Sequence, residues 1–258
     1  MFGQIAEVYR RTRKPKDILW NRLVARPLAA VLLVPLRSTR ITPNQITLLT
    51  LVVFAVGAAM LALWPGRRAL VIAACVVELS YVLDCVDGQL ARLKGTSSPV
   101  GAHLDFLMDE LKAFLLIAAV GIRLWLASAD PRWLVEGLLG LVIVASAISL
   151  TTFLRRPEYA AATGAKIGLG AGDYGAGFGQ ASDGAAPAAP AASRRWSPLR
   201  LVEAVGKFIV HYPSYILFVA FADRIDLFLH AYILMNGAYA ARSLLGISLR
   251  LGRRTRTP

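Results

Sequence analysis

The chain has 258 residues, 56% of them hydrophobic, and its mean hydropathy of +0.55 is too high for an ordinary soluble domain. A net charge of +13 could indicate a nucleic-acid partner. However, the Lys and Arg residues stand at the ends of apolar segments, so we expect the anionic surface of a lipid bilayer and no nucleic acid. The two cysteines, Cys75 and Cys85, share one apolar segment and are expected to be small buried side chains.

The first 40 residues are predicted to form a separate N-terminal region. Residues 1–15 are basic and carry no apolar run, so we expect no cleavable signal peptide. Residues 16–36 mix apolar and basic side chains, which favours an amphipathic helix on the membrane surface that ends near Pro35. A seventh membrane span is the alternative, disfavoured by Arg22, Arg26, Pro27 and Pro35.

The region 41–250 is predicted to be a transmembrane catalytic domain, followed by a basic tail at 251–258. Thr42 and Pro43 suit a helix start. Six apolar segments follow, each near the roughly 20 residues that cross a bilayer: 45–64, 69–91, 100–127, 133–154, 206–222 with a kink at Pro213, and 226–248. The predicted fold class is therefore an all-α integral membrane protein with six transmembrane helices plus the N-terminal surface helix.

The segment 157–197 is rich in Ala, Gly, Pro and Ser and is predicted to be a flexible loop. Its glycine-rich stretch 168–172 follows no strand, so we do not expect a phosphate-binding loop there. Six spans place both termini on one side of the membrane, and most of the 29 lysines and arginines lie on that side. We therefore predict an integral membrane protein with cytoplasmic termini, a cytoplasmic loop and a cytoplasmic active site. In a bacterial cell, this membrane would be the inner membrane.

Four carboxylates stand at the edges of the second and third apolar segments. Such groups are costly near hydrocarbon unless they are paired, hydrated or metal-bound. At helical spacing, Asp84 and Asp87 share one helix face, and Asp105 and Asp109 share another. The turn signals at 94–99 reverse the chain, so the two faces can meet. Four clustered negative charges favour one or two divalent cations, and oxygen ligands suit Mg²⁺, Mn²⁺ or Ca²⁺ rather than Zn²⁺.

Small and basic residues accompany these carboxylates. Gly88, Ala91 and Gly101 leave room for a bulky ligand near the backbone, and Arg92 supplies a charge that suits a phosphate. The whole pattern, D-x2-D-G-x2-A-R-x8-G-x3-D-x3-D, fills every fixed position of the signature of the CDP-alcohol phosphotransferase (phosphatidyltransferase) family. The chain thus resembles that family, most strongly in the motif and more weakly from about Thr42 to Leu249.

The resemblance implies a homodimeric enzyme of phospholipid biosynthesis. It would move a substituted phosphoryl group from a CDP-linked donor, expected to be CDP-diacylglycerol, to a small alcohol acceptor, with release of CMP. Two Mg²⁺ or Mn²⁺ ions would assist. Asp84, Asp87 and Asp105 would be metal ligands, and Asp109 would complete the site and act as general base. The resemblance also implies CDP contacts from Gly88, Ala91, Arg92, Gly101 and Asn44.

Three basic residues are candidates for binding an anionic acceptor. Arg155 and Arg156 follow the fourth predicted span, where membrane anchoring is the alternative role. Lys112 lies on the face of Asp105 and Asp109, so it either neutralises the carboxylates or touches the acceptor. The acceptor itself is left open among glycerol 3-phosphate, an inositol phosphate, serine and others.

Other ionisable residues are expected to have local structural roles. Glu78 lies away from the Asp84 face and is interpreted as a helix-packing residue or a polar partner. Local packing or interface roles are expected for His103, His211 and His230. Two other classes of protein could carry such carboxylates, an aspartate-rich membrane prenyltransferase and a cation or proton transporter. The first would not need the Gly and Ala-Arg framework, and the second would need a path across the membrane.

Overall fold

A computed structural model describes residues 2–12, 18–163, 208–209 and 211–252, and every regular element in these ranges is helical. The elements are α1 (Phe2–Thr12), the π-helix η1 (Asn21–Ala25), α2 (Arg26–Leu36), α3 (Pro43–Leu63), α4 (Arg67–Lys94), α5 (Pro99–Ser128), α6 (Arg132–Leu154), α7 (Pro157–Thr163), the 3₁₀ helix η2 (Tyr212–Ser214), α9 (Ile216–Phe221) and α10 (Ile225–Gly252). The predicted all-α class is confirmed.

Four of the described helices, α3 to α6, are long and apolar enough to cross a membrane. They coincide with the first four predicted spans. The predicted fifth span, 206–222, is not one continuous helix in its described part, because the turn η2 at Pro213 leads into the six-residue α9. Proline cannot donate the helical hydrogen bond, which accounts for a break at this point. α10 has 28 residues but is not among the four, so the count of six spans stays a prediction.

The N-terminal region contains more helix than the sequence indicated. The segment predicted to be merely basic forms α1, and α2 ends at Leu36, close to the expected end at Pro35. Ala29, Ala30 and Leu33 are completely buried, in a cluster that includes Tyr81 and Val86 of α4. This side of α2 therefore faces protein, and the placement of the helix on a membrane surface stays a prediction.

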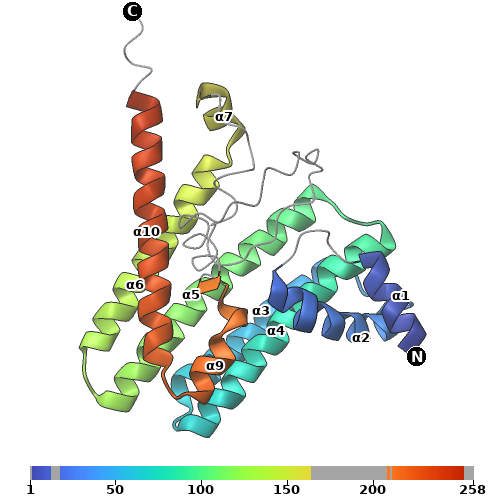
Figure 1. Cartoon of the computed structure of the whole chain (residues 1–258), viewed down its shortest axis with the longest axis horizontal. Helices are drawn as coiled ribbons and strands as arrows, with labels where there is room; N and C mark the ends of the chain where they lie inside the picture. Colours follow the sequence, from blue (N-terminus) through green and yellow to red (C-terminus); the bar gives the residue numbers. More distant parts are fainter. Residues whose placement is uncertain (1, 13–17, 164–207, 210, 253–258) are drawn as a thin grey trace, which may run out of the picture.

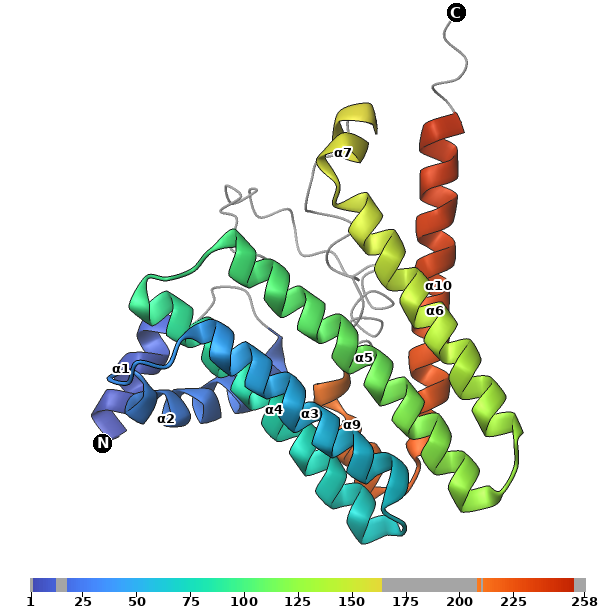
Figure 2. The ribbon, with the colours of Figure 1, turned by 180° about the vertical axis from the view of Figure 1, so that it is seen from behind.

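The long helix α5 lies between two groups of helices (Figures 1 and 2). On one side it packs against α3, which in turn packs against α4, and α1, α2 and α9 also pack against α4. On the other side α5 packs against α6, and α10 runs beside α6. The core between these helices is apolar and includes Phe54, Leu70, Leu116 and Phe228, all fully buried. This core holds α4 and α5, the two carriers of the acidic motif, in fixed positions.

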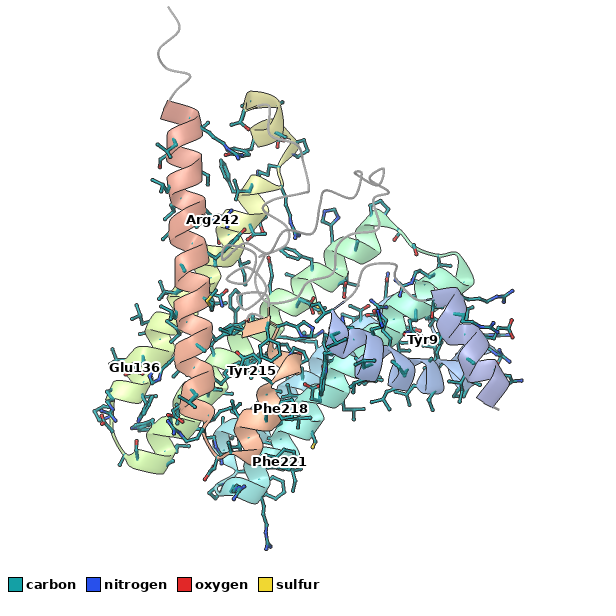
Figure 3. The ribbon with its side chains drawn as sticks, in the orientation of Figure 1. Tyr9, Glu136, Tyr215, Phe218, Phe221 and Arg242 are labelled. Carbon is teal, nitrogen blue, oxygen red and sulfur yellow. The ribbon has the colours of Figure 1, made fainter. Side chains whose placement is uncertain are left out.

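Aromatic side chains join α9 to its neighbours. Tyr215, Phe218 and Phe221 are spread along this short segment (Figure 3). Phe218 meets Trp20 edge-on, with ring centroids 6.2 Å apart, and Tyr215 packs on Phe228 of α10 at 5.4 Å. The segment therefore bridges the N-terminal region and α10.

Two further expectations need correction. Cys75 is exposed, whereas Cys85 is buried as predicted, because α4 turns only part of its surface towards the protein. The loop predicted over 157–197 begins with the helix α7, whose Tyr159 is buried and packs on Phe153. Its remaining residues, including the glycine-rich stretch 168–172, lie outside the described residues.

Candidate active site

The turn between α4 and α5 brings the two halves of the acidic motif together. Gly95 ends α4 with φ 66°, a left-handed conformation that glycine adopts without steric cost. The Thr96 N–H donates to the carbonyl of Ala91 at 2.9 Å, which closes the helix end. Ser98 then caps α5, since its Oγ accepts from the N–H of Gly101 at 3.0 Å. The chain reversal predicted from the sequence is confirmed.

Three carboxylates gather where α4 and α5 face each other. One oxygen from each of Asp84, Asp105 and Asp109 lies within 4.8 Å of the others. Asp84 and Asp109 are buried, and Asp105 is half-buried. Such a set of oxygen ligands fits a hard divalent cation, and the mutual repulsion of the carboxylates favours one. The site can therefore hold a metal ion through these three residues.

Lys112 neutralises part of this charge. Its Nζ donates to Asp84 Oδ1 at 2.5 Å and to Asp109 Oδ1 at 3.1 Å, and only 1% of the side chain is exposed. The neutralising role considered for Lys112 is thus confirmed. Its role in acceptor binding stays a prediction, because the described contacts direct the ammonium at the carboxylates.

Asp87 lies outside the group of three. Its Oδ2 accepts a hydrogen bond of 2.6 Å from the hydroxyl of Thr47 on α3, whose oxygen is also 3.1 Å from the carbonyl of Pro43. Both side chains are buried. Thr47 was not predicted as a site residue from the sequence, although a threonine one turn after Asn44, on an apolar helix, is a polar residue in need of a partner.

Two of the expected nucleotide contacts lie next to each other. A Cβ atom added at Gly101 would be 3.4 Å from Asn44 Oδ1 and 3.2 Å from Ser98 Oγ. Asn44, at the start of α3, is exposed, so its amide is accessible beside this bare backbone.

The other expected nucleotide contacts lie on α4. Gly88 and Ala91 are half-buried there. The Nε of Arg92 donates to the carbonyl of Thr12 in α1 at 3.0 Å, which ties α1 to the motif.

The two arginines after α6 have different surroundings. The Arg155 guanidinium lies over the ring of Phe106 on α5, with its Cζ 4.7 Å from the centroid, and the side chain is half-buried. Burial lowers the pKa of Arg155, and the neighbouring Tyr239 and Glu110 oppose that shift. Arg156 is exposed. The structure thus brings only Arg155 up to α5, next to the helix that carries Asp105 and Asp109.

The three histidines singled out from the sequence have local contacts, as expected, whereas the role of Glu78 stays a prediction. Glu78 is buried in α4. The Tyr81 hydroxyl donates to Asn21 Oδ1 at 2.6 Å and is 2.8 Å from His211 Nε2, so this histidine belongs to a buried polar cluster that links η1, α4 and η2. Asn21 was not singled out from the sequence. His103 lies 2.9 Å from the Pro99 carbonyl, and His230 lies 3.0 Å from Glu136.

Carboxylates therefore gather beside the turn between two long apolar helices, each able to cross a membrane, with small and basic residues next to them. Residues 40–176 match the model of the CDP-alcohol phosphatidyltransferase family, about half of the chain. The chain belongs to this family, and the resemblance stated from its motif is confirmed.

Curated relatives of this chain are similar over part of its length. The bifunctional IPC transferase and DIPP synthase of Rubrobacter xylanophilus is 36% identical over 100 residues, which cover 37% of this chain and 22% of the relative. The phosphatidylinositol phosphate synthase of Corynebacterium glutamicum is 29% identical over 137 residues, covering 53% of this chain and 57% of the relative. The chain thus spans between a fifth and three fifths of these relatives.

Solved structures of similar shape include the phosphatidylinositol phosphate synthase of Mycobacterium tuberculosis. With CDP-DAG bound, that enzyme superposes with a TM-score of 0.47 and 20% identity, over 89% of this chain and 92% of the other. In complex with manganese and citrate, it superposes with a TM-score of 0.48 and 22% identity, over 91% of this chain and 90% of the other.

Proposed function

We propose that the protein transfers a phosphatidyl group from CDP-diacylglycerol to the hydroxyl of a small alcohol and releases CMP. The observation that carries the proposal is the convergence of three carboxylates of the family motif, Asp84, Asp105 and Asp109, within 4.8 Å. Family membership favours this reaction over the two alternatives, the prenyltransferase and the ion transporter.

Asp84, Asp105 and Asp109 would hold a divalent cation, with Asp87 available on the same face of α4. We infer Mg²⁺ or Mn²⁺, in one or two ions, because all the side chains offered are carboxylates. When bound, the cation would neutralise charge on the pyrophosphate and on the departing CMP. Lys112 keeps two of these carboxylates close together through its ion pairs.

Asp109 is proposed as the general base. The bond between phosphorus and the CMP oxygen breaks, the bond between phosphorus and the acceptor oxygen forms, and the acceptor proton passes to the Asp109 carboxylate. A base must be ionised to act, and the Lys112 ammonium lies 3.1 Å from Asp109 Oδ1.

The remaining residues would bind the substrates. Asn44 and Gly101 adjoin each other and would contact the cytidine end of the donor, with Gly88, Ala91 and Arg92 along the neighbouring face of α4. Arg155 would hold a phosphate on an anionic acceptor, such as glycerol 3-phosphate or an inositol phosphate. We also propose a homodimer with its termini and active site on the cytoplasmic side.

One experiment tests this function directly. The purified protein is incubated with CDP-diacylglycerol, Mg²⁺ or Mn²⁺ and a panel of alcohols, and CMP release is recorded. We expect CMP to form only with a divalent cation and with an accepted alcohol. Asp109→Asn should abolish turnover while calorimetry with Mn²⁺ still detects donor binding. CMP formation at the wild-type rate by Asp109→Asn would contradict the role of the base, and absence of CMP with every alcohol would contradict the proposed donor.

A further inference from the structure

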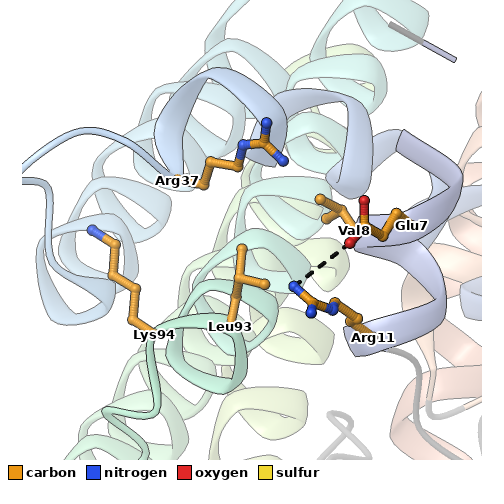
Figure 4. Close-up of a pocket in the computed structure, with 6 residues that line it drawn as sticks. All are labelled: Glu7, Val8, Arg11, Arg37, Leu93 and Lys94. Atoms are coloured by element: carbon orange, nitrogen blue, oxygen red, sulfur yellow. Dashed lines mark ion pairs between the residues drawn. The ribbon is translucent and has the colours of Figure 1, made fainter. Parts of the chain in front are cut away.

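A basic pocket lies away from the carboxylates, between α1 and the C-terminal ends of α2 and α4 (Figure 4). It encloses about 280 Å³ and is lined by Glu7, Val8, Arg11, Arg37, Leu93 and Lys94. Val8 is buried and belongs, with Leu93, to the apolar cluster that joins α1 to α4. The pocket therefore has an apolar floor and a charged rim, and its volume suits a small ligand.

The rim carries an excess of positive charge. The lining residues include three cations, Arg11, Arg37 and Lys94, and one carboxylate, that of Glu7. Glu7 lies 3.6 Å from Arg11, and both side chains are more than half exposed, so this pair binds weakly. Within the described residues, no acidic side chain pairs with Arg37. An anion in the pocket could therefore bind the guanidinium of Arg37, which no described carboxylate neutralises, and that of Arg11, which Glu7 neutralises only weakly.

Helix ends explain only part of this charge. Basic side chains at helix C-termini favourably meet exposed carbonyls. Lys94 does so, since its Nζ donates to the carbonyls of Thr39 and Ile41 at 2.9 and 2.8 Å. An ammonium has three donors, so one remains for a ligand. For Arg11 and Arg37, the described contacts show no hydrogen bond from the side chain to a helix carbonyl. Stabilisation of a helix end also does not require that both side chains line one cavity.

The position of the pocket indicates the kind of ligand. Lys94 is the last residue of α4, one of the helices able to span a membrane, so the pocket lies where that helix ends. Phosphates of lipid headgroups are found at this level. A planar guanidinium group can donate two parallel hydrogen bonds to two oxygens of one phosphate. We propose that the pocket binds a phosphate group, carried by an anionic phospholipid headgroup or free in solution.

A phosphate bound in this pocket would also stabilise the position of Arg92, the arginine of the acidic motif. Arg11 precedes Thr12, whose carbonyl accepts the hydrogen bond from Arg92 Nε. A phosphate bridging Arg11 and Arg37 would fasten α1 to α2 and α4, and so keep the Thr12 carbonyl against Arg92. This consequence, unlike the binding itself, rests on the proposed role of Arg92 in CDP binding. Anionic lipid would then strengthen donor binding.

The binding test uses the full-length protein and needs no turnover. Native mass spectrometry of the protein released from nanodiscs compares the number of phosphatidylglycerol molecules that it retains with the number of phosphatidylcholine molecules. Calorimetry in neutral detergent measures the affinity of the protein for inorganic phosphate. Arg37→Gln should weaken the bound species roughly 10- to 100-fold, the loss expected for one charge-assisted contact. Arg40→Gln is the matched control, because Arg40 is exposed, is close in sequence and does not line the pocket.

The two binding measurements distinguish a phosphate carried by a lipid headgroup from a phosphate free in solution. Selective retention of phosphatidylglycerol without binding of inorganic phosphate assigns a lipid headgroup, and binding of inorganic phosphate assigns a free anion. No binding of either, or equal loss in Arg37→Gln and Arg40→Gln, overturns the site. Arg37→Lys, which keeps the charge, and Arg11→Gln serve if Arg37→Gln fails to fold. The coupling to Arg92 is overturned if phosphatidylglycerol changes the donor Kd equally in wild type and Arg37→Gln. Failure of the proposed reaction would leave the binding results unaffected.

Discussion

The hydroxyl of Thr47 donates to the carboxylate of Asp87 at 2.6 Å, and this bond joins α3 to α4 at the level of the acidic site. Both side chains are buried, so the carboxylate depends on the threonine for part of its solvation. Helix periodicity groups Asp87 with Asp84, but Asp87 is held from α3, while Lys112 holds Asp84 from α5. The two aspartates on one helix face therefore have different supports.

Thr47→Val should destabilise the protein by about 1–3 kcal/mol, because an isosteric side chain leaves a buried carboxylate without its hydroxyl partner. Thr47→Ser keeps the hydroxyl and serves as the control. Thermal unfolding in detergent measures the difference. An unchanged Tm in Thr47→Val would show that Asp87 does not need this bond.

Lys112→Met should cost more, about 3–5 kcal/mol in the presence of EDTA, because it removes the cation from a buried group of carboxylates. A divalent cation can replace the missing charge. We therefore expect Mn²⁺ to raise the Tm of Lys112→Met more than that of wild type, whereas Arg156→Met, at an exposed position, should behave like wild type. Equal Mn²⁺ effects in all three proteins would contradict metal binding at this cluster.

The acidic site was largely predictable from sequence, since the spacing of Asp84, Asp105 and Asp109 is set by helix periodicity and the turn by local residues such as Gly95. The residues that contact the site and its surroundings from other helices were not predictable. The Thr47 and Asp87 bond joins residues 40 positions apart, and the Tyr81 and His211 contact joins residues 130 apart. Such pairs depend on how helices pack, which a local pattern does not contain. For the same reason the sequence could not separate Arg155 from Arg156.

Gly101→Ala should separate stability from donor binding. Alanine favours a helix over glycine by up to about 1 kcal/mol, which offsets the weakening of the Ser98 cap on α5, so the Tm should change little. The added Cβ would lie 3.2 Å from Ser98 Oγ, which would have to shift by a few tenths of an ångström, and it would fill the space in front of Asn44 Oδ1, 3.4 Å away. We expect the calorimetric Kd for CDP-diacylglycerol to rise roughly 10-fold, the equivalent of one weakened hydrogen bond. Gly246→Ala, where a Cβ meets nothing within 4 Å, is the control, and equal donor affinities in the two variants would exclude Asn44 and Gly101 from the nucleotide site.

Arg155→Ala and Arg156→Ala form the last matched pair. Arg155 lies over Phe106, 4.7 Å from the ring centroid, next to the helix of Asp105 and Asp109, whereas Arg156 is exposed. A charge-assisted contact to an acceptor phosphate contributes roughly 1.5–3 kcal/mol, so Arg155→Ala should raise the KM of an anionic acceptor about 10- to 100-fold while the donor Kd stays constant. Arg156→Ala should leave both values unchanged, because an exposed arginine at a helix end acts as a membrane anchor. If the preferred acceptor is neutral or zwitterionic, or if the two variants share one KM, Arg155 does not bind an acceptor phosphate and only packs on Phe106.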